Sequence, residues 1–159
     1  MNLIKVDKFL PRVLPYAENL PELVARRAVS DACRELMEEA LNFELTYKFT
    51  TKPGEERYKI ALPYRMQCTK VKSGSIRKPD MRGRWQLTQT TAETLDTYSY
   101  PVSWRDVEGS PVVYLFRQPD EIVLAPVPDC ELEVELVCGA TISRDAMEVP
   151  EILYEDFAD

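Results

Sequence analysis

The chain has 159 residues, 45% of them hydrophobic and 30% charged, which is typical of one globular domain or of two small layers sharing one core. It contains no histidine, which excludes Ser-His-Asp and Cys-His catalysis, histidine acid-base catalysis and histidine-ligated metals. Its five glycines form neither of the two common phosphate-binding loops, G-x-G-x-x-G and G-x-x-x-x-G-K-[ST], so nucleotide chemistry is not expected.

The net charge of -7 is divided unevenly along the chain. Residues 1–118 carry 19 basic and 15 acidic side chains, a balance of +4. Residues 119–159 carry one basic and 12 acidic side chains, a balance of -11. Such asymmetry is informative about partners and assembly rather than about fold.

Four cysteines are scattered along the chain without a C-x-x-C pair, a signal peptide or a run of 18 apolar residues. This pattern predicts buried free thiols in a reducing cytoplasm, and it lacks the ligand spacing of a zinc site. Disulfides would form only where the fold brings pairs together. The four residues are Cys33, Cys68, Cys130 and Cys138.

The N-terminal segment, residues 7–16, has apolar side chains at helical spacing, but Pro11 and Pro15 forbid a long helix. We therefore predict a short helical turn followed by an extended arm, which is free to lie across an adjacent protomer.

The clearest helix signal begins at Asn19, which is placed to cap a helix with Pro21 in its first turn and Glu22 three residues after the cap. Pairs of apolar residues then recur every four positions, from Val24/Ala25 to Ala40/Leu41. The pattern predicts an amphipathic helix of about five to six turns. We interpret its small side chains as good helix formers that pack in the core, although they would also let another helix approach closely.

After the helix the apolar period changes to two. Alternation from Phe43 to Phe49, a turn at 52–55 and apolar residues at 58–62 predict a β-hairpin. Residues 66–71 are typical of a further strand, and residues 72–84 of a polar, basic connection.

The next segment has a strand-like pattern at Trp85 and Leu87, then a short helix at 91–98 capped by Thr91 or Thr94. Strong strand patterns follow at 110–116, 121–125 and 131–137.

The last of these strands alternates without a break, with Leu132, Val134 and Leu136 on one face. We interpret the carboxylates on its other face as solvent-facing side chains of a half-buried strand rather than as a cation site. Those carboxylates are Glu131, Glu133 and Glu135.

A second helix is predicted to begin at 149–151, and the sequence stops after about two turns of it. A helix this short buries little surface alone, so either the natural chain continues or this end docks on a partner. The residues predicted to dock on such a partner are Ile152, Leu153, Tyr154 and Phe157.

Together these elements predict an α+β fold in which an N-terminal arm and long amphipathic helix pack with an antiparallel β-sheet or sandwich. The predicted segments are residues 1–42 (arm and helix), 43–148 (antiparallel β domain with the basic loop 72–84) and 149–159 (start of a C-terminal helix), in one folded unit.

A basic stretch with an aromatic neighbour spans residues 70–85 and has the charge density of a loop that contacts nucleic acid or protein. The acidic pI near 4.8 and the lack of a helix-turn-helix, zinc finger or RNP-like motif favour a solvated or protein-contacting loop over direct DNA contact. The residues predicted to form an interface or to contact DNA in a channel are Lys70, Lys72, Arg77, Lys78, Arg82, Arg84 and Trp85.

The spacing of aromatic, glycine and proline residues over nearly the whole chain resembles that of tailed-bacteriophage head-to-tail adaptor proteins. In the second half, the resemblance rests on Trp104, Gly109-Ser-Pro111, Tyr114, Ile122-Val-Leu124, Pro126, Pro128-Asp129 and Val134-Glu-Leu136. In the first half, it rests on Phe9, Pro11, Val13, Pro21, Ala28, Ala32 and Leu62-Pro63. The chain departs from the family pattern after Val149-Pro150, where Tyr154 does not match the usual spacing and the further helices of such proteins are missing.

The resemblance implies a structural role without catalysis, cofactor or metal. Such a protein is made in the host cytoplasm and located in the neck of the virion. Its partners would be further copies of the chain in a ring, often of twelve, together with the portal protein, the next tail component and the double-stranded DNA that passes through the channel. No membrane partner is implied.

Two other functions stay open from the sequence: a small nucleic-acid-binding module that uses residues 70–85, and, more distantly, a histidine-free hydrolase. The charge division further predicts that the basic loop of one protomer meets the acidic C-terminal strand surface of its neighbour or of the portal.

Overall fold

The computed structural model describes residues 1–17, 19–40, 43–98 and 102–157 of the chain. Contacts divide the chain into two compact units, which we call the helical unit (residues 1–43 and 141–159) and the β unit (residues 44–140). The two ends of the sequence therefore lie in the same unit. Residues 141–148, assigned from the sequence to the β domain, belong to the helical unit.

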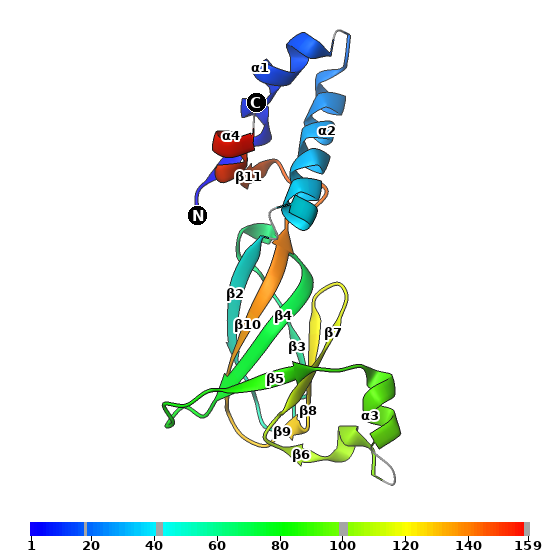
Figure 1. The fold of residues 1–159 in the computed structure, drawn as a ribbon, viewed down its shortest axis with the longest axis vertical. Coiled ribbons are helices and arrows are strands. Elements are labelled where there is room, and N and C mark those ends of the chain that lie inside the picture. The colour runs from blue at the N-terminus through cyan, green and yellow to red at the C-terminus, as the bar shows by residue number, and fades with distance from the viewer. Residues whose placement is uncertain (18, 41–42, 99–101, 158–159) are drawn as a thin grey trace. The chain divides into compact units, whose positions relative to one another are not determined.

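In the helical unit, short elements lie along one side of a longer helix (Figure 1). A two-stranded antiparallel sheet joins the first and last parts of the chain, with Ile4 opposite Val149. The elements are β1 (Leu3–Lys5), η1 (Val6–Lys8), α1 (Leu10–Val13), η2 (Leu14–Tyr16), α2 (Glu22–Glu35), the π-helical turn η3 (Leu36–Ala40), β11 (Glu148–Pro150) and α4 (Ile152–Phe157).

The N-terminal segment is helical and packed, so the predicted extended arm is wrong. Residues 6–16 form three consecutive short helical elements, and Pro11 and Pro15 each stand in a first turn, where a proline costs no hydrogen bond. Val6, Phe9 and Leu10 are buried. The segment thus contributes to the core of its own unit instead of extending across a neighbouring copy.

The long helix starts later than predicted. Asn19 has a left-handed backbone with a φ of 69°, which asparagine tolerates better than most residues, and Pro21 takes the N-cap position without a side-chain capping bond. Arg26 fixes the first turn, because its guanidinium pairs with Glu22 at 2.6 Å and with Asp7 of η1 at 2.9 Å.

The apolar pairs of α2 are half buried. In the first three pairs one member faces the core of the helical unit and the other is exposed beside it. The buried members of the first four pairs are Ala25, Val29, Cys33 and Met37. The exposed members of the first three pairs, which we call the exposed flank, are Val24, Ala28 and Ala32. The apolar surface of α2 is therefore wider than the surface that its own unit covers.

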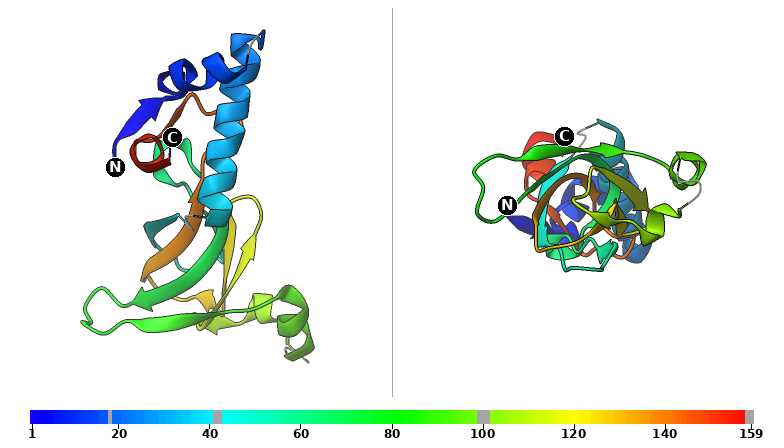
Figure 2. Two further views of the ribbon diagram at one scale, coloured as in Figure 1. Left: turned by 45° about the horizontal axis from the view of Figure 1, so that its top comes forward. Right: turned by 90° about the horizontal axis from the view of Figure 1, so that it is seen from below.

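The β unit is one curled sheet with short helices at its margin (Figures 1 and 2). Its strand order is β2-β10-β4-β5-β7-β8-β3, and a second small sheet pairs β6 with β9. The elements are β2 (Glu44–Thr50), β3 (Arg57–Lys59), η4 (Pro63–Arg65), β4 (Gln67–Arg77), β5 (Trp85–Gln89), α3 (Ala92–Tyr98), η5 (Trp104–Asp106), β6 (Glu108–Gly109), β7 (Val113–Arg117), β8 (Glu121–Ala125), β9 (Val127–Pro128) and β10 (Glu133–Thr141), whose last residue lies in the helical unit.

The chain is a mixture of helix and sheet, and the sheet is mixed rather than purely antiparallel as predicted. Strands β5 and β7 run parallel, because the connection between them crosses over through α3 and η5. The predicted short helix in this connection is confirmed. Thr91 caps it, since its Oγ1 accepts a hydrogen bond from the backbone N–H of Thr94 at 3.2 Å.

The predicted hairpin of residues 43–62 is wrong. Strand β2 pairs with β10 and β3 with β8, so the two strands that flank the 52–55 turn are the outermost strands of the sheet. Side chains bring these edges together: Tyr47 donates a hydrogen bond to the Lys59 carbonyl at 3.2 Å, and the Phe49 and Tyr58 rings lie 4.8 Å apart. Side-chain contacts thus link the two edges of the curled sheet.

Strand β10 organises the interior of the β unit. Leu132 before it and Val134 and Leu136 within it are fully buried, as the alternation predicted, each contributing about 1.5–3 kcal/mol by burial. Gly139 lets β4 approach, because a Cβ at this position would lie 2.9 Å from Oγ1 of Thr69 and 3.1 Å from Cγ of Lys70.

We expect Gly139→Ala to lower the free energy of unfolding by about 1–3 kcal/mol, because the added methyl group meets β4 at less than contact distance. Gly83→Ala is the matched control, since nothing lies within 4 Å of its added Cβ. Urea denaturation of the two variants measures the difference, and equal stability would contradict the packing described here.

Candidate interaction site

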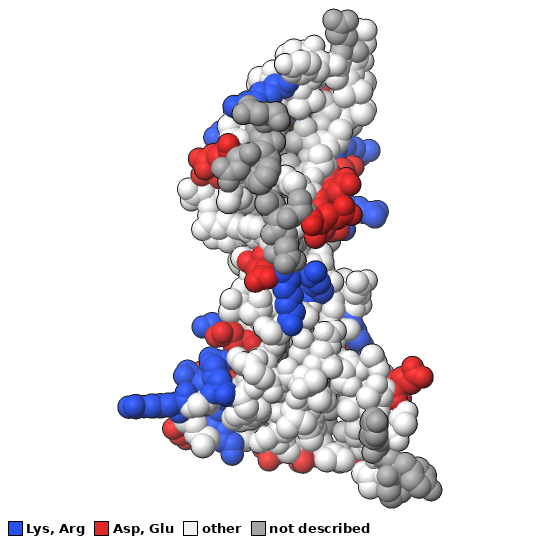
Figure 3. Space-filling model, viewed as in Figure 1, with Lys and Arg blue, Asp and Glu red and all other residues white. Residues whose placement is uncertain are grey.

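The predicted basic stretch is a β-hairpin rather than a long loop. Strand β4 continues to Arg77 and β5 begins at Trp85, so only residues 78–84 connect them. In Figure 3, Lys and Arg side chains gather over this connection, which stands out from the sheet in Figures 1 and 2. Lys72 and Arg77 fit within β4 because carboxylates of the sheet, Glu44 of β2 and Glu133 of β10, pair with them.

Two carboxylates on the outer face of β10, those of Glu133 and Glu135, form a charged network with basic side chains. Glu133 accepts a hydrogen bond from Arg77, and Arg84 lies 3.9 Å from Glu133 and 3.5 Å from Glu135. Lys48 of β2 lies 3.0 Å from Glu135. Glu133 and Glu135 are therefore paired with basic side chains of their own chain, which corrects their interpretation as simply solvent-facing. Glu131, the third member of the predicted row, is exposed as predicted.

The network changes the pKa values of Glu133, Glu135 and Arg77. The hydrogen bond from Arg77 holds the pKa of Glu133 below its ordinary value, and the bond from Lys48 does the same for the pKa of Glu135. The pKa of Arg77 is raised by the same pairing with Glu133. All three groups are thus held in their charged forms at neutral pH.

Two further predicted interface residues are also engaged. Lys72 pairs with Glu44 of β2, and the indole N–H of Trp85 donates to the Pro111 carbonyl at 3.1 Å. Trp85 is half-buried, so it is not an open platform for stacking a base. The other three, Lys70, Lys78 and Arg82, are exposed and make no ion pair within the part of the chain that the structure describes.

The C-terminal residues predicted to dock on a partner are mostly packed within the helical unit. Leu153 is buried, and the Tyr154 ring lies edge-on to Phe9 at 5.1 Å and under the Arg12 guanidinium at 4.8 Å. Ile152 alone is shown to be exposed, while the side chain of Phe157 lies outside the described residues. The predicted docking set therefore reduces to one exposed residue of known position.

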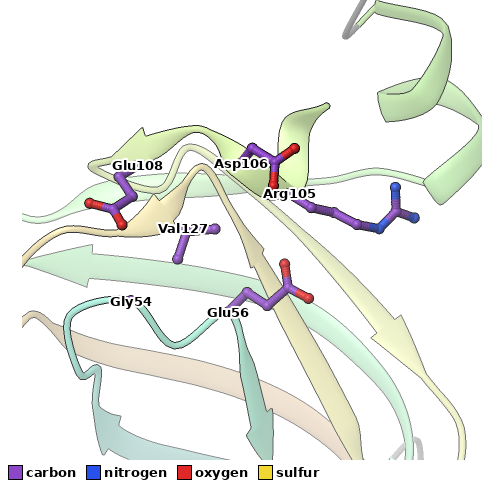
Figure 4. Close-up of a pocket in the computed structure, with 6 residues that line it drawn as sticks. All are labelled: Gly54, Glu56, Arg105, Asp106, Glu108 and Val127. Carbon is purple, nitrogen blue, oxygen red and sulfur yellow. The ribbon is translucent and has the colours of Figure 1, made fainter. Parts of the chain in front are cut away.

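A hollow of about 480 Å³ lies between η5, β6, β9 and the 52–56 turn (Figure 4). Glu56, Asp106 and Glu108 line it, but Glu56 pairs with Arg57 at 3.1 Å. Arg105, also in its lining, extends toward α3, where it lies 3.0 Å from Asp96 and stacks on Trp104 at 4.3 Å. Sequence reasoning gave no signal for this hollow, because its residues meet only through tertiary contacts.

Asp96 ties α3 to the core of the β unit. Its carboxylate accepts from the Trp104 indole N–H at 2.7 Å and from Arg105 at 3.0 Å, and these bonds lower its pKa. Trp104 itself packs with Leu115 and Val123. This contact gives a structural function to one of the aromatic positions on which the family resemblance rests.

The four cysteines are free thiols. Cys33, Cys68 and Cys138 are buried, as predicted, whereas Cys130 is half-buried and departs from the prediction. Burial raises the pKa of Cys33 to about 11, which suppresses thiolate reactivity. Among the described residues, no group of three or more Cys, Asp or Glu side chains is arranged to hold a metal ion. No described helix has the length and apolar character needed to cross a bilayer.

Comparison of the sequence with protein-family models and with curated proteins found no match. The resemblance to phage adaptor proteins therefore stays a prediction made from residue spacing.

We expect Arg77→Met to raise the pKa of Glu133, because it removes the hydrogen bond that is the main cause of the lowered value. The folded-state pKa lies below the unfolded one, so the stabilisation from this pair is complete above the ordinary glutamate pKa and is lost as the pH falls through the lowered value. NMR titration of the side-chain carboxyl carbons measures the shift.

Arg82→Met is the matched control for that titration, since Arg82 makes no ion pair within the described residues. An unchanged Glu133 pKa in Arg77→Met, or an equal change in both variants, would contradict the assigned cause.

Proposed function

We propose that this chain is a structural, non-catalytic subunit of a bacteriophage head-to-tail connector ring, which docks under the portal and extends the DNA channel toward the tail. The observation that carries the proposal is the uncovered apolar flank of α2, supported by the spacing resemblance to adaptor proteins. Apolar surface that stays exposed to water in a single subunit is unfavourable in free energy, and a neighbouring subunit that covers it stabilises the folded chain.

The uncovered flank of α2 is apolar over successive turns. Val24 is 47% exposed, and the exposed small residues Ala28 and Ala32 follow it at four-residue spacing. Leu23, in the first turn beside Val24, is 63% exposed. Tyr16, just before the helix, is also exposed. Large side chains at one end and small ones along the rest are suited to the close approach of another helix.

The proposed partners follow from the same function: further copies of the chain in a ring of about twelve by resemblance, the portal, the next tail component and the packaged DNA. The proposed location is the neck of the virion. That the arm and long helix pack with the β-sheet in one folded unit also stays a prediction.

The alternative function, a nucleic-acid-binding module, has weaker support. Of the seven residues predicted for it, Lys72, Arg77 and Arg84 are already paired with carboxylates, and Trp85 is hydrogen-bonded and half-buried. Only Lys70, Lys78 and Arg82 remain for phosphates, which limits the electrostatic part of the affinity.

We expect the double variant Leu23→Glu, Val24→Glu to prevent ring formation, because buried carboxylates would face an apolar neighbour. Val112→Glu is the matched control, since Val112 is 54% exposed on the β unit. Mass photometry and electron microscopy, with and without a portal, measure assembly. Rings from the double variant, or a wild-type chain that never forms rings, would contradict the proposal.

For the alternative function, duplex and single-stranded DNA binding should be weak in the wild type and should fall steeply with salt concentration if phosphates are contacted. Substitution of Lys78 and Arg82 by Ala tests the remaining basic side chains by fluorescence anisotropy. Tight binding that these substitutions abolish would favour the nucleic-acid function over the connector ring.

A further inference from the structure

The connection between β4 and β5, residues 78–84, ends in a surface that we call the hairpin tip. Lys78 and Arg82 are exposed there without an ion pair in the described residues, and between them Met81 is 56% exposed. Asp80 lies in the same connection, so the tip combines a modest positive charge with an exposed apolar side chain.

The composition of the hairpin tip favours a protein over DNA as its partner. DNA phosphates attract basic side chains but make no favourable contact with an exposed Met, and they repel the carboxylate of Asp80. Methionine is adaptable and common in protein interfaces, where it fills an apolar depression on the partner. The complementary surface must therefore be acidic and partly apolar.

The helical unit carries such a surface on its C-terminal segment, which we call the acidic face. Met147 is 60% exposed and Ile152 is 46% exposed, and three acidic side chains lie in the same segment. These are Asp145, Glu148 and Glu155, all exposed and without an ion pair among the described residues. Figure 3 shows acidic side chains gathered over α4.

Two other acidic surfaces fit the hairpin tip less well. The carboxylates of β10 are paired with Arg77, Arg84 and Lys48 of their own chain, so the contact predicted from the sequence through this strand would have to break existing pairs. The end of α2 exposes Glu35 and Glu39, but no large apolar side chain of the described residues is exposed beside them.

We propose that the hairpin tip of one copy docks on the acidic face of the next copy, with Met81 against Met147 and Ile152 and with Lys78 and Arg82 beside the carboxylates. The inference rests on the proposed connector ring and names two surfaces through which adjacent copies in that ring contact each other. Because two different surfaces of the same chain meet, the contact is head-to-tail, which is the kind of contact that closes into a ring.

A photo-crosslinking amino acid at position 81 tests the contact directly. Residues 145–159 contain no Lys or Arg, so trypsin releases the acidic face as a single peptide after Arg144. In mixed rings of ¹⁵N-labelled and unlabelled protein, we expect a cross-link from position 81 to this peptide that joins labelled to unlabelled chains. The same cross-linker at Val112, which is similarly exposed, is the control and should not reach it.

Charge reversal tests the contact in solution. We expect Lys78→Glu with Arg82→Glu, and separately Asp145→Lys with Glu148→Lys, to weaken ring association about tenfold or more, because like charges then face each other. Combining the four substitutions should restore much of the association. Glu93→Lys with Glu108→Lys, on exposed carboxylates of the β unit outside both proposed surfaces, is the charge-matched control and should leave association unchanged.

The outcomes separate the contact from the ring. Rings that form normally despite the reversals, or cross-links only to other peptides, would overturn the contact while leaving the connector function standing. Cross-linking of position 81 to DNA alone would overturn it in favour of a channel contact. A wild-type chain that stays monomeric with and without a portal would overturn both proposals.

Discussion

The period-two alternation of β10 is the constraint on which the rest of the β unit depends. One face of the strand buries Val134 and Leu136 in the core, and the other presents Glu133 and Glu135. Since β10 lies between β2 and β4, both neighbours must supply basic side chains opposite those carboxylates, and they do so through Lys48 and Arg77. A register shift of one residue would bury both carboxylates. The burial of the apolar side chains and the pairing of the carboxylates therefore favour the same register.

This arrangement changes what the charge division of the sequence means. Part of the positive charge of the first 118 residues and part of the negative charge of the rest cancel across the strands of one chain. The surfaces that we propose for partners are smaller and more local: the hairpin tip on the β unit and the acidic face on the helical unit. Both include exposed apolar side chains, Met81 on one and Met147 and Ile152 on the other, so their fit depends on shape as well as charge.

Sequence reasoning succeeded where a local period repeats and failed where pairing is set by distant segments. The strands near 85–89, 113–117 and 121–125 and the Thr91-capped helix follow from alternation and capping chemistry. The 43–62 hairpin was predicted because a turn joins two strands, yet those strands pair with β10 and β8 instead. The predicted basic stretch forms a hairpin rather than a long loop, and the pairing of Arg77 with a carboxylate more than fifty residues away left no local signal.

The sequence by itself determined that histidine-dependent catalysis and histidine-ligated metals are excluded, that helix and strand are mixed, and that β10 has two different faces. These features depend only on residue types and short periods. The tertiary structure alone decided which basic side chains are already neutralised, that the N-terminal segment is packed rather than extended, and that one flank of α2 remains uncovered. Each of these depends on which distant residues share a surface, and a one-dimensional pattern does not carry that information.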